Sequence, residues 1–81
     1  MDRQEIVDKL TEIFRTVFND DELVLTEKMS AKDVENWTSL TNMILITEIE
    51  KDFGIKFKLK QLMTLISVEN FIVAIEENLQ A

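Results

Sequence analysis

Hydrophobic residues recur at helical spacing along the first eighteen positions of the chain. The apolar positions are Ile6, Val7, Leu10, Ile13, Phe14, Val17 and Phe18. At about 100° per residue they fall within an arc of roughly 140°, which predicts an amphipathic helix over residues 2–18. Asp2 and Glu5 suit the positive end of its dipole, and residues 19–21 (Asn-Asp-Asp) are a plausible end.

A second helix is predicted over residues 39–53, where the apolar positions form two stripes. The stripe that suits the core holds Leu45, Ile46, Ile49 and Phe53. The other holds Leu40, Met43 and Ile44, and shares its face with Thr47 and Lys51. This second stripe either packs under the preceding loop or contacts a partner protein. Thr38 or Ser39 can cap the helix, and Gly54 stands where a left-handed residue ends one.

The segment between these helices, residues 19–38, shows no strong periodicity. The side chains that can pin it to the core are Leu23, Leu25, Met29, Val34 and Trp37. Trp37 is expected to be a packing anchor, with shaping of the adjacent loop as its alternative role. Residues 30–33 can form one short turn with Ser30 as its cap.

The last part of the chain predicts one short helix and one longer helix. Residues 55–60 alternate apolar and basic side chains, but no pairing partner is evident, so an extended loop is expected. A short helical turn is predicted within residues 61–66. Ser67 then caps a last helix, whose apolar residues span an arc of roughly 100°. These residues are Val68, Phe71, Ile72, Ile75 and Leu79.

Composition supports a single all-α domain over residues 1–81. The chain has 46% hydrophobic residues, enough for one core, although a domain this small buries a modest share of its surface. It has no proline and one glycine, and this scarcity of turn residues favours helices over a many-stranded sheet. The expected fold is a bundle of three main helices with a short fourth before the last.

A net charge of −7 disfavours nucleic acid and anionic membrane surfaces as partners, and so disfavours a membrane-surface helix protein. It favours basic patches on other proteins. No apolar stretch approaches the roughly 20 residues that a membrane span needs, and residues 1–5 do not begin a signal peptide. A cytoplasmic protein is therefore expected.

The chain contains no histidine and no cysteine, so nucleophile–base pairs and thiolate metal sites are unavailable. No catalytic residues are expected, and the protein is predicted not to be an enzyme. Residues 20–22 lack the ligand spacing and glycine of a calcium loop, so no metal site is predicted. Ser39, at a predicted helix start, is either only a cap or a hydroxyl that another enzyme modifies.

Three features together carry a family resemblance. Residues 38–40 read Thr-Ser-Leu, residues 48–55 form an acidic stretch that ends in Phe-Gly-Ile, and Ser39 and Phe53 lie 14 positions apart. The apolar pattern continues through Phe57, Leu62, Leu65, Val68, Ile72 and Ile75. The chain thereby resembles the acyl carrier protein family, and Trp37 resembles a Trp-Asp-Ser-Leu subgroup of small stand-alone carriers.

The resemblance implies a four-helix carrier bundle with a 4′-phosphopantetheine arm on Ser39, next to Thr38 and Leu40. A phosphopantetheinyl transferase would take the arm from coenzyme A, using magnesium. Acyl or aminoacyl groups would then travel as thioesters between loading and transferring enzymes of fatty acid, polyketide or polysaccharide biosynthesis. The family also implies a monomer.

Two departures from the family pattern affect the expected partners. Thr38 replaces the usual aspartate, which helps transferase recognition in the family, and Ile44 and Lys51 replace common glutamates. The expected partner-facing residues are Leu40, Met43, Ile44, Thr47, Glu48 and Lys51. The candidate acyl-pocket residues are Phe57, Leu62 and Leu65, which also suit the core. The competing interpretation is an interaction module with the carrier fold and no prosthetic group.

Overall fold

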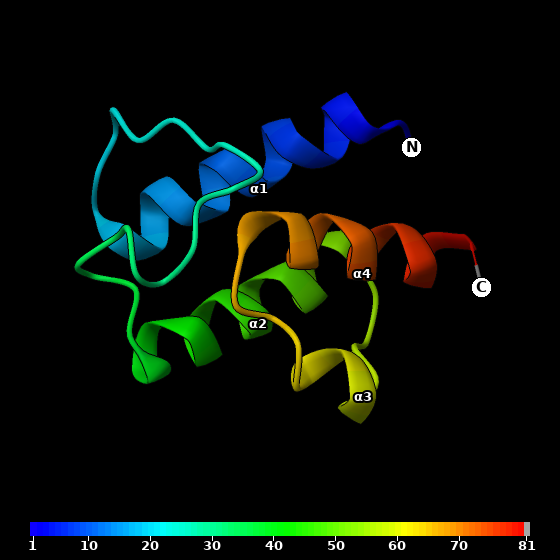
Figure 1. Cartoon of the computed structure of the whole chain (residues 1–81). Helices are drawn as coiled ribbons and strands as arrows, with labels where there is room; N and C mark the ends of the chain where they lie inside the picture. Colours follow the sequence, from blue (N-terminus) through cyan, green and yellow to red (C-terminus); the bar gives the residue numbers. More distant parts are fainter. Residues whose placement is uncertain (81) are drawn as a thin grey trace.

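The computed structural model describes residues 1–80, which fold into four helices (Figure 1). The helices are α1 (Arg3–Phe18), α2 (Ser39–Phe53), α3 (Leu59–Leu62) and α4 (Val68–Gln80). Helices α2 and α4 run in the direction opposite to α1, and α3 lies below them in this view. Within this range the β structure is limited to one isolated bridge between Ser30 and Ser67. The predicted all-α bundle is confirmed.

The two long N-terminal helices end where the sequence predicts. The Asp2 side chain accepts a hydrogen bond from the Glu5 backbone N–H at 2.8 Å, and the Glu5 carboxylate accepts one from the Asp2 backbone, which forms a capping box. Asn19 ends α1 in the left-handed conformation, with φ 54°. Gly54 does the same for α2 with φ 66°, where the absence of a Cβ removes the steric cost.

The short helix begins two residues earlier than predicted. Helix α3 covers Leu59–Leu62, not part of residues 61–66 alone, so the expected loop over 55–60 is wrong at its last two residues. Gln61 explains the difference, because its side chain accepts a hydrogen bond from the Lys58 backbone N–H at 2.8 Å. A glutamine at this third helical position starts a helix in the manner of a capping box.

Aromatic rings fill the centre of the core. Phe14 meets Trp37 at a centroid distance of 5.3 Å and Phe71 at 6.0 Å, both nearly perpendicular. The Phe57 ring centroid lies 6.3 Å from that of Phe71. Edge-to-face contacts of this kind add stability beyond the burial of apolar area. Trp37 is only 4% exposed, so its predicted role as a packing anchor is confirmed.

The loop between α1 and α2 is fixed at several points. Its partly buried side chains pack on the core as predicted; they are Leu23, Leu25, Met29 and Val34. Ser30 organises the predicted turn, because its hydroxyl accepts a hydrogen bond from the Lys32 backbone N–H at 3.3 Å. The Val68 N–H donates to the Met29 carbonyl at 2.9 Å, which joins the loop to the start of α4.

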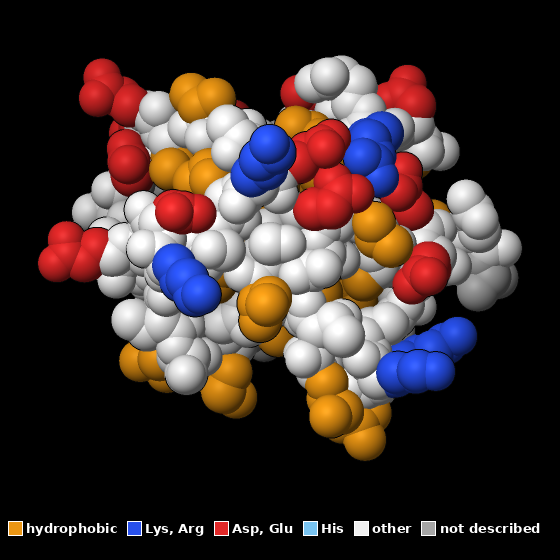
Figure 2. All heavy atoms as spheres, in the orientation of Figure 1, with side chains coloured by type: hydrophobic (Ala, Val, Ile, Leu, Met, Phe, Trp, Pro, Cys, Tyr) orange, Lys and Arg blue, Asp and Glu red, His pale blue; other side chains and the backbone are white. Residues whose placement is uncertain are grey.

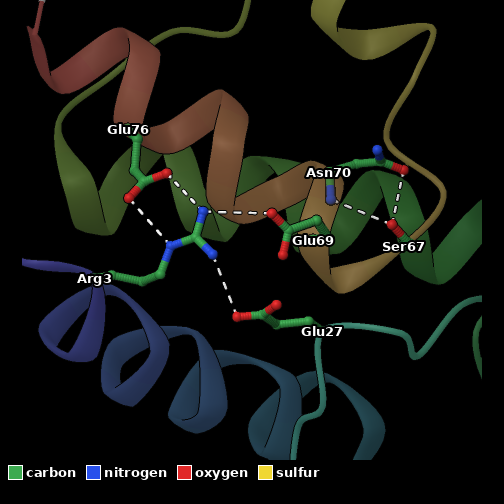
Figure 3. Close-up of polar contacts among 6 residues, drawn as sticks. All are labelled: Arg3, Glu27, Ser67, Glu69, Asn70 and Glu76. Carbon is green, nitrogen blue, oxygen red and sulfur yellow. Dashed lines mark hydrogen bonds and ion pairs between the residues drawn. The ribbon is translucent and has the colours of Figure 1, made fainter.

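Ser67 caps α4, as the sequence predicts. The Ser67 hydroxyl accepts a hydrogen bond from the Asn70 backbone N–H at 3.2 Å and donates to the Asn70 side-chain oxygen at 2.9 Å (Figure 3). The buried face of α4 packs on α1 through Phe71 and Phe14, and Phe71 and Ile72 are both fully buried. Helix α4 therefore completes the hydrophobic core.

Arg3 connects three parts of the chain through carboxylates (Figure 3). Its guanidinium makes a two-pronged contact with Glu76 of α4, with Nη2–Oε1 2.9 Å and Nε–Oε2 3.3 Å. It also reaches Glu27 of the loop at 3.2 Å and Glu69 of α4 at 3.3 Å. The hydrogen bonds from Arg3 hold the pKa of Glu76 below its ordinary value. In return, the contact with Glu76 raises the pKa of Arg3.

The lowered pKa of Glu76 predicts a specific acid sensitivity. Because the folded-state pKa lies below the unfolded-state value near 4.5, the stabilisation is complete above that pH and is lost as the pH falls through the folded-state pKa. We expect Glu76→Gln to flatten the loss of unfolding free energy on acidification, measured by urea denaturation at a series of pH values. Glu35→Gln, at an exposed site, is the control and should keep the native slope. Equal slopes for the native chain and Glu76→Gln would contradict the assignment.

Candidate functional site

Thr38 and Ser39 occupy different positions at the start of α2. Thr38 is the capping residue, with its side chain accepting from the Thr41 backbone N–H at 3.3 Å. The Thr41 hydroxyl in turn accepts from the Thr38 backbone N–H at 2.7 Å. Ser39 is the first helical residue and is exposed. The interpretation of Ser39 as the helix cap is therefore wrong, and its hydroxyl is available at the surface.

The helix end beside Ser39 is electrostatically suited to an anion. The first backbone N–H groups of a helix have no acceptor within it, and the positive end of the dipole lies here. Thr38 takes only the N–H of Thr41, which leaves those of Ser39 and Leu40 without a partner inside the helix. The first turn of α2 contains no acidic residue. A phosphate ester on the Ser39 hydroxyl fits these surroundings.

Trp37 and Asn42 fix the position of this helix start. The Trp37 indole N–H donates to the Asn42 side-chain oxygen at 2.9 Å, and the Asn42 amide N–H lies 3.5 Å from the Leu65 carbonyl. Trp37 therefore shapes the loop as well as anchoring it. A hollow of about 160 Å³ lies beside Ser39, lined in part by Asn42, Leu65 and Ile66. Sequence reasoning missed Thr41 and Asn42; only a Thr-x-x-Thr spacing could have indicated Thr41.

Comparison with known proteins then settles the family. Among solved structures, the chain is similar to a holo acyl carrier protein from Geobacter metallireducens, determined in solution by NMR. The two chains are 42% identical, with a TM-score of 0.84, and the match covers 91% of this chain and 85% of that one. The chain belongs to the acyl carrier protein family. No family model matches the chain, and no curated protein matches it.

The second apolar stripe of this acyl carrier protein lies on the surface. Leu40, Met43 and Ile44 are 69%, 67% and 43% exposed, so packing under the loop is wrong. The polar candidates on the same face are also exposed; they are Thr47, Glu48 and Lys51. The core stripe is confirmed, because Leu45, Ile49 and Phe53 are buried and Ile46 is partly buried. Whether the exposed stripe binds partners stays a prediction.

Further apolar side chains around α3 were missed by the sequence reasoning. Leu59, Met63 and Ile66 are all strongly exposed. Figure 2 shows hydrophobic side chains along the lower edge of the molecule, below α2 and α3. Only Leu59 of these three lies within the loop expected over residues 55–60. The chain thus presents exposed apolar surface on α2 and in and after α3.

The candidate acyl-pocket residues all belong to the core region. Phe57 and Leu65 are buried, and Leu62 is partly buried against the core cluster. Their packing role is confirmed, while a role in sheltering an acyl chain stays a prediction. None of the helices in residues 1–80 of this carrier is long and apolar enough to cross a membrane.

Proposed function

We propose that this protein carries acyl or aminoacyl intermediates as thioesters on a 4′-phosphopantetheine arm attached to Ser39. The observation that carries the proposal is the exposed Ser39 hydroxyl, freed from capping by Thr38. The relative from Geobacter metallireducens is a holo protein, which supports a prosthetic group in this chain as well. Fold and sequence similarity over most of both chains support the same conclusion.

Each residue at the site has a distinct role in this proposal. Ser39 Oγ forms the ester bond, Thr38 holds the first turn of α2, and the backbone N–H groups of Ser39 and Leu40 face the phosphate charge. The arm supplies a terminal thiol, a group that this cysteine-free chain does not contain. The chain itself positions the arm and performs no catalysis.

The partners in this proposal are a phosphopantetheinyl transferase and the cytoplasmic enzymes that load and transfer the cargo. They contact the exposed stripe of α2, with Leu40, Met43 and Ile44 at its centre. Thr47, Glu48 and Lys51 lie along its polar side. Because the centre of the stripe is apolar, docking depends more on desolvation than on charge.

Incubation with coenzyme A, magnesium and a broad-specificity phosphopantetheinyl transferase tests the attachment site. We expect the intact mass of the native chain to increase by one phosphopantetheine group. Ser39→Ala should show no gain, and Thr41→Ser, which keeps a hydroxyl two residues away, should be modified like the native chain. A folded native chain that gains no mass would contradict the proposal and favour an interaction module without an arm.

Substitution of Thr38 tests the departure from the family pattern. Aspartate caps helices as well as threonine does and places a negative charge at the positive end of α2. We expect Thr38→Asp to be modified severalfold faster than the native chain, with the unfolding free energy unchanged within about 0.5 kcal/mol. The measurement is the initial rate of mass gain with the same transferase. An unchanged rate would show that Thr38 does not limit recognition.

A charge placed in the stripe tests the docking surface. Met43→Asp should slow modification of Ser39 about fivefold, because losing an apolar contact at an interface costs about 1 kcal/mol. Val24→Asp is the matched control, since Val24 is equally exposed but lies in the loop between α1 and α2. Its rate should equal that of the native chain. Equal rates for both variants would remove the stripe from the transferase interface.

A further inference from the structure

A groove of about 520 Å³ lies between α1 and α2. Ile13 and Val17 of α1 supply its apolar lining. Both are only partly buried, so their outer surface remains in contact with solvent. The volume lies within the range of about 300–1,000 Å³ that is typical of clefts that bind ligands.

The groove lies on a flank of α1 that α4 does not cover. Arg3 and Phe14 contact α4 from α1, through Glu76 and Phe71. At about 100° per residue, Glu12 lies on the opposite side of the helix from Arg3 and Phe14, Ile13 lies about a quarter turn from them, and Val17 lies about 40–60° from them. The partner element across the groove is α2, which contributes Glu48 and Asp52. No other element within residues 1–80 lines this groove.

Carboxylates dominate the rim of the groove. Asp8 and Glu12 on α1 face Glu48 and Asp52 on α2, and the one basic residue in the lining is Lys9. The Lys9 ammonium is already engaged, 3.3 Å from the Asp52 carbonyl, 3.7 Å from its carboxylate and 4.5 Å from the Phe53 ring centroid. The rim therefore keeps an excess of negative charge over an apolar floor.

The apolar floor and the acidic rim together indicate what kind of ligand the groove can bind. Covering the apolar floor with apolar side chains in place of water is favourable. The negatively charged rim attracts cationic groups and repels nucleic acid and anionic lipid. A groove between two long helices also suits a third helix laid along it. An amphipathic helix with apolar residues on one face and lysine or arginine beside them satisfies both conditions.

We propose that the groove between α1 and α2 docks a short basic amphipathic helix of a partner protein. Its apolar side chains cover Ile13 and Val17, and its basic side chains lie beside Asp8, Glu12 and Glu48. The exposed stripe of Leu40, Met43 and Ile44 is a separate set of residues, so Ser39 stays accessible when the groove is filled. This inference goes beyond the carrier function and does not depend on the arm.

A designed peptide tests the proposal on the full chain. The probe is a helical peptide of about 15 residues, with leucines at helical spacing and arginines flanking them; the control peptide has the arginines replaced by glutamates. In NMR titrations of the isotope-labelled protein, we expect the amide signals of residues 8–17 and 48–52 to shift. Raising the salt from about 50 mM to about 300 mM should weaken binding, and the glutamate peptide should not bind.

Charge reversal in the rim is the matched mutational test. Asp8→Lys with Glu12→Lys should weaken peptide binding about tenfold. Asp21→Lys with Glu22→Lys makes the same charge change in the exposed loop and should leave the affinity near native. Circular dichroism checks the fold of both variants. Modification of Ser39 should be unaffected by either pair, so failure of the groove and failure of the carrier proposal are distinguishable.

Several outcomes would overturn the proposal. One is the absence of any shift at about 1 mM peptide, and another is shifts confined to the stripe of Leu40, Met43 and Ile44. Shifts in residues 8–17 that depend on protein concentration without peptide would identify a second copy of this chain as the occupant. If both variant pairs weakened peptide binding equally, the peptide would be responding to the net charge of the protein and not to the groove.

Discussion

The contact of Trp37 with Phe14 and Phe71 determines where the functional end of the molecule lies. The loop between α1 and α2 has no regular structure of its own, so its final residues must be fixed by side chains. Trp37 inserts between the aromatic rings of α1 and α4, and its indole N–H holds Asn42 in the first turn of α2. One buried side chain therefore orients the helix start, and with it the exposed Ser39.

The separation of the capping hydroxyl of Thr38 from the exposed residue Ser39 follows from helix geometry. A residue that caps a helix directs its side chain back to the backbone, so its hydroxyl is occupied, whereas the next residue directs its side chain outward. Thr38 and Ser39 have similar chemistry, but the turn places one in each position. An arm on Ser39, as proposed, would need a stable helix end and a free hydroxyl at the same place, and the two adjacent hydroxyl residues would meet both needs.

The sequence predicted the parts of the fold that depend on local pattern. Periodicity gave α1, α2 and α4 with their ends, and Gly54 fixed the end of α2 through its backbone conformation. The position of α3 depended on one Gln61 hydrogen bond, which no periodicity reveals in a helix so short. The choice between Thr38 and Ser39 as cap depends on a local pair of hydrogen bonds between Thr38 and Thr41 that periodicity does not reveal. The exposure of the Met43 stripe depends on tertiary structure, so the sequence left it open. The groove was not predicted because its residues come from two helices.

The distribution of charge explains how a chain of net charge −7 presents two surfaces of different chemistry. Arg3 gathers three glutamates of the loop and α4 at one place and partly neutralises them. On α2, Glu48 lies between the apolar stripe and the groove, where the carboxylates of α1 face those of α2. Around α2 the surface therefore changes from an exposed apolar stripe to a groove rim rich in carboxylates. The two surfaces share Glu48 at their border, whereas Leu40, Met43 and Ile44 belong to the stripe alone and Asp8 and Glu12 to the groove alone.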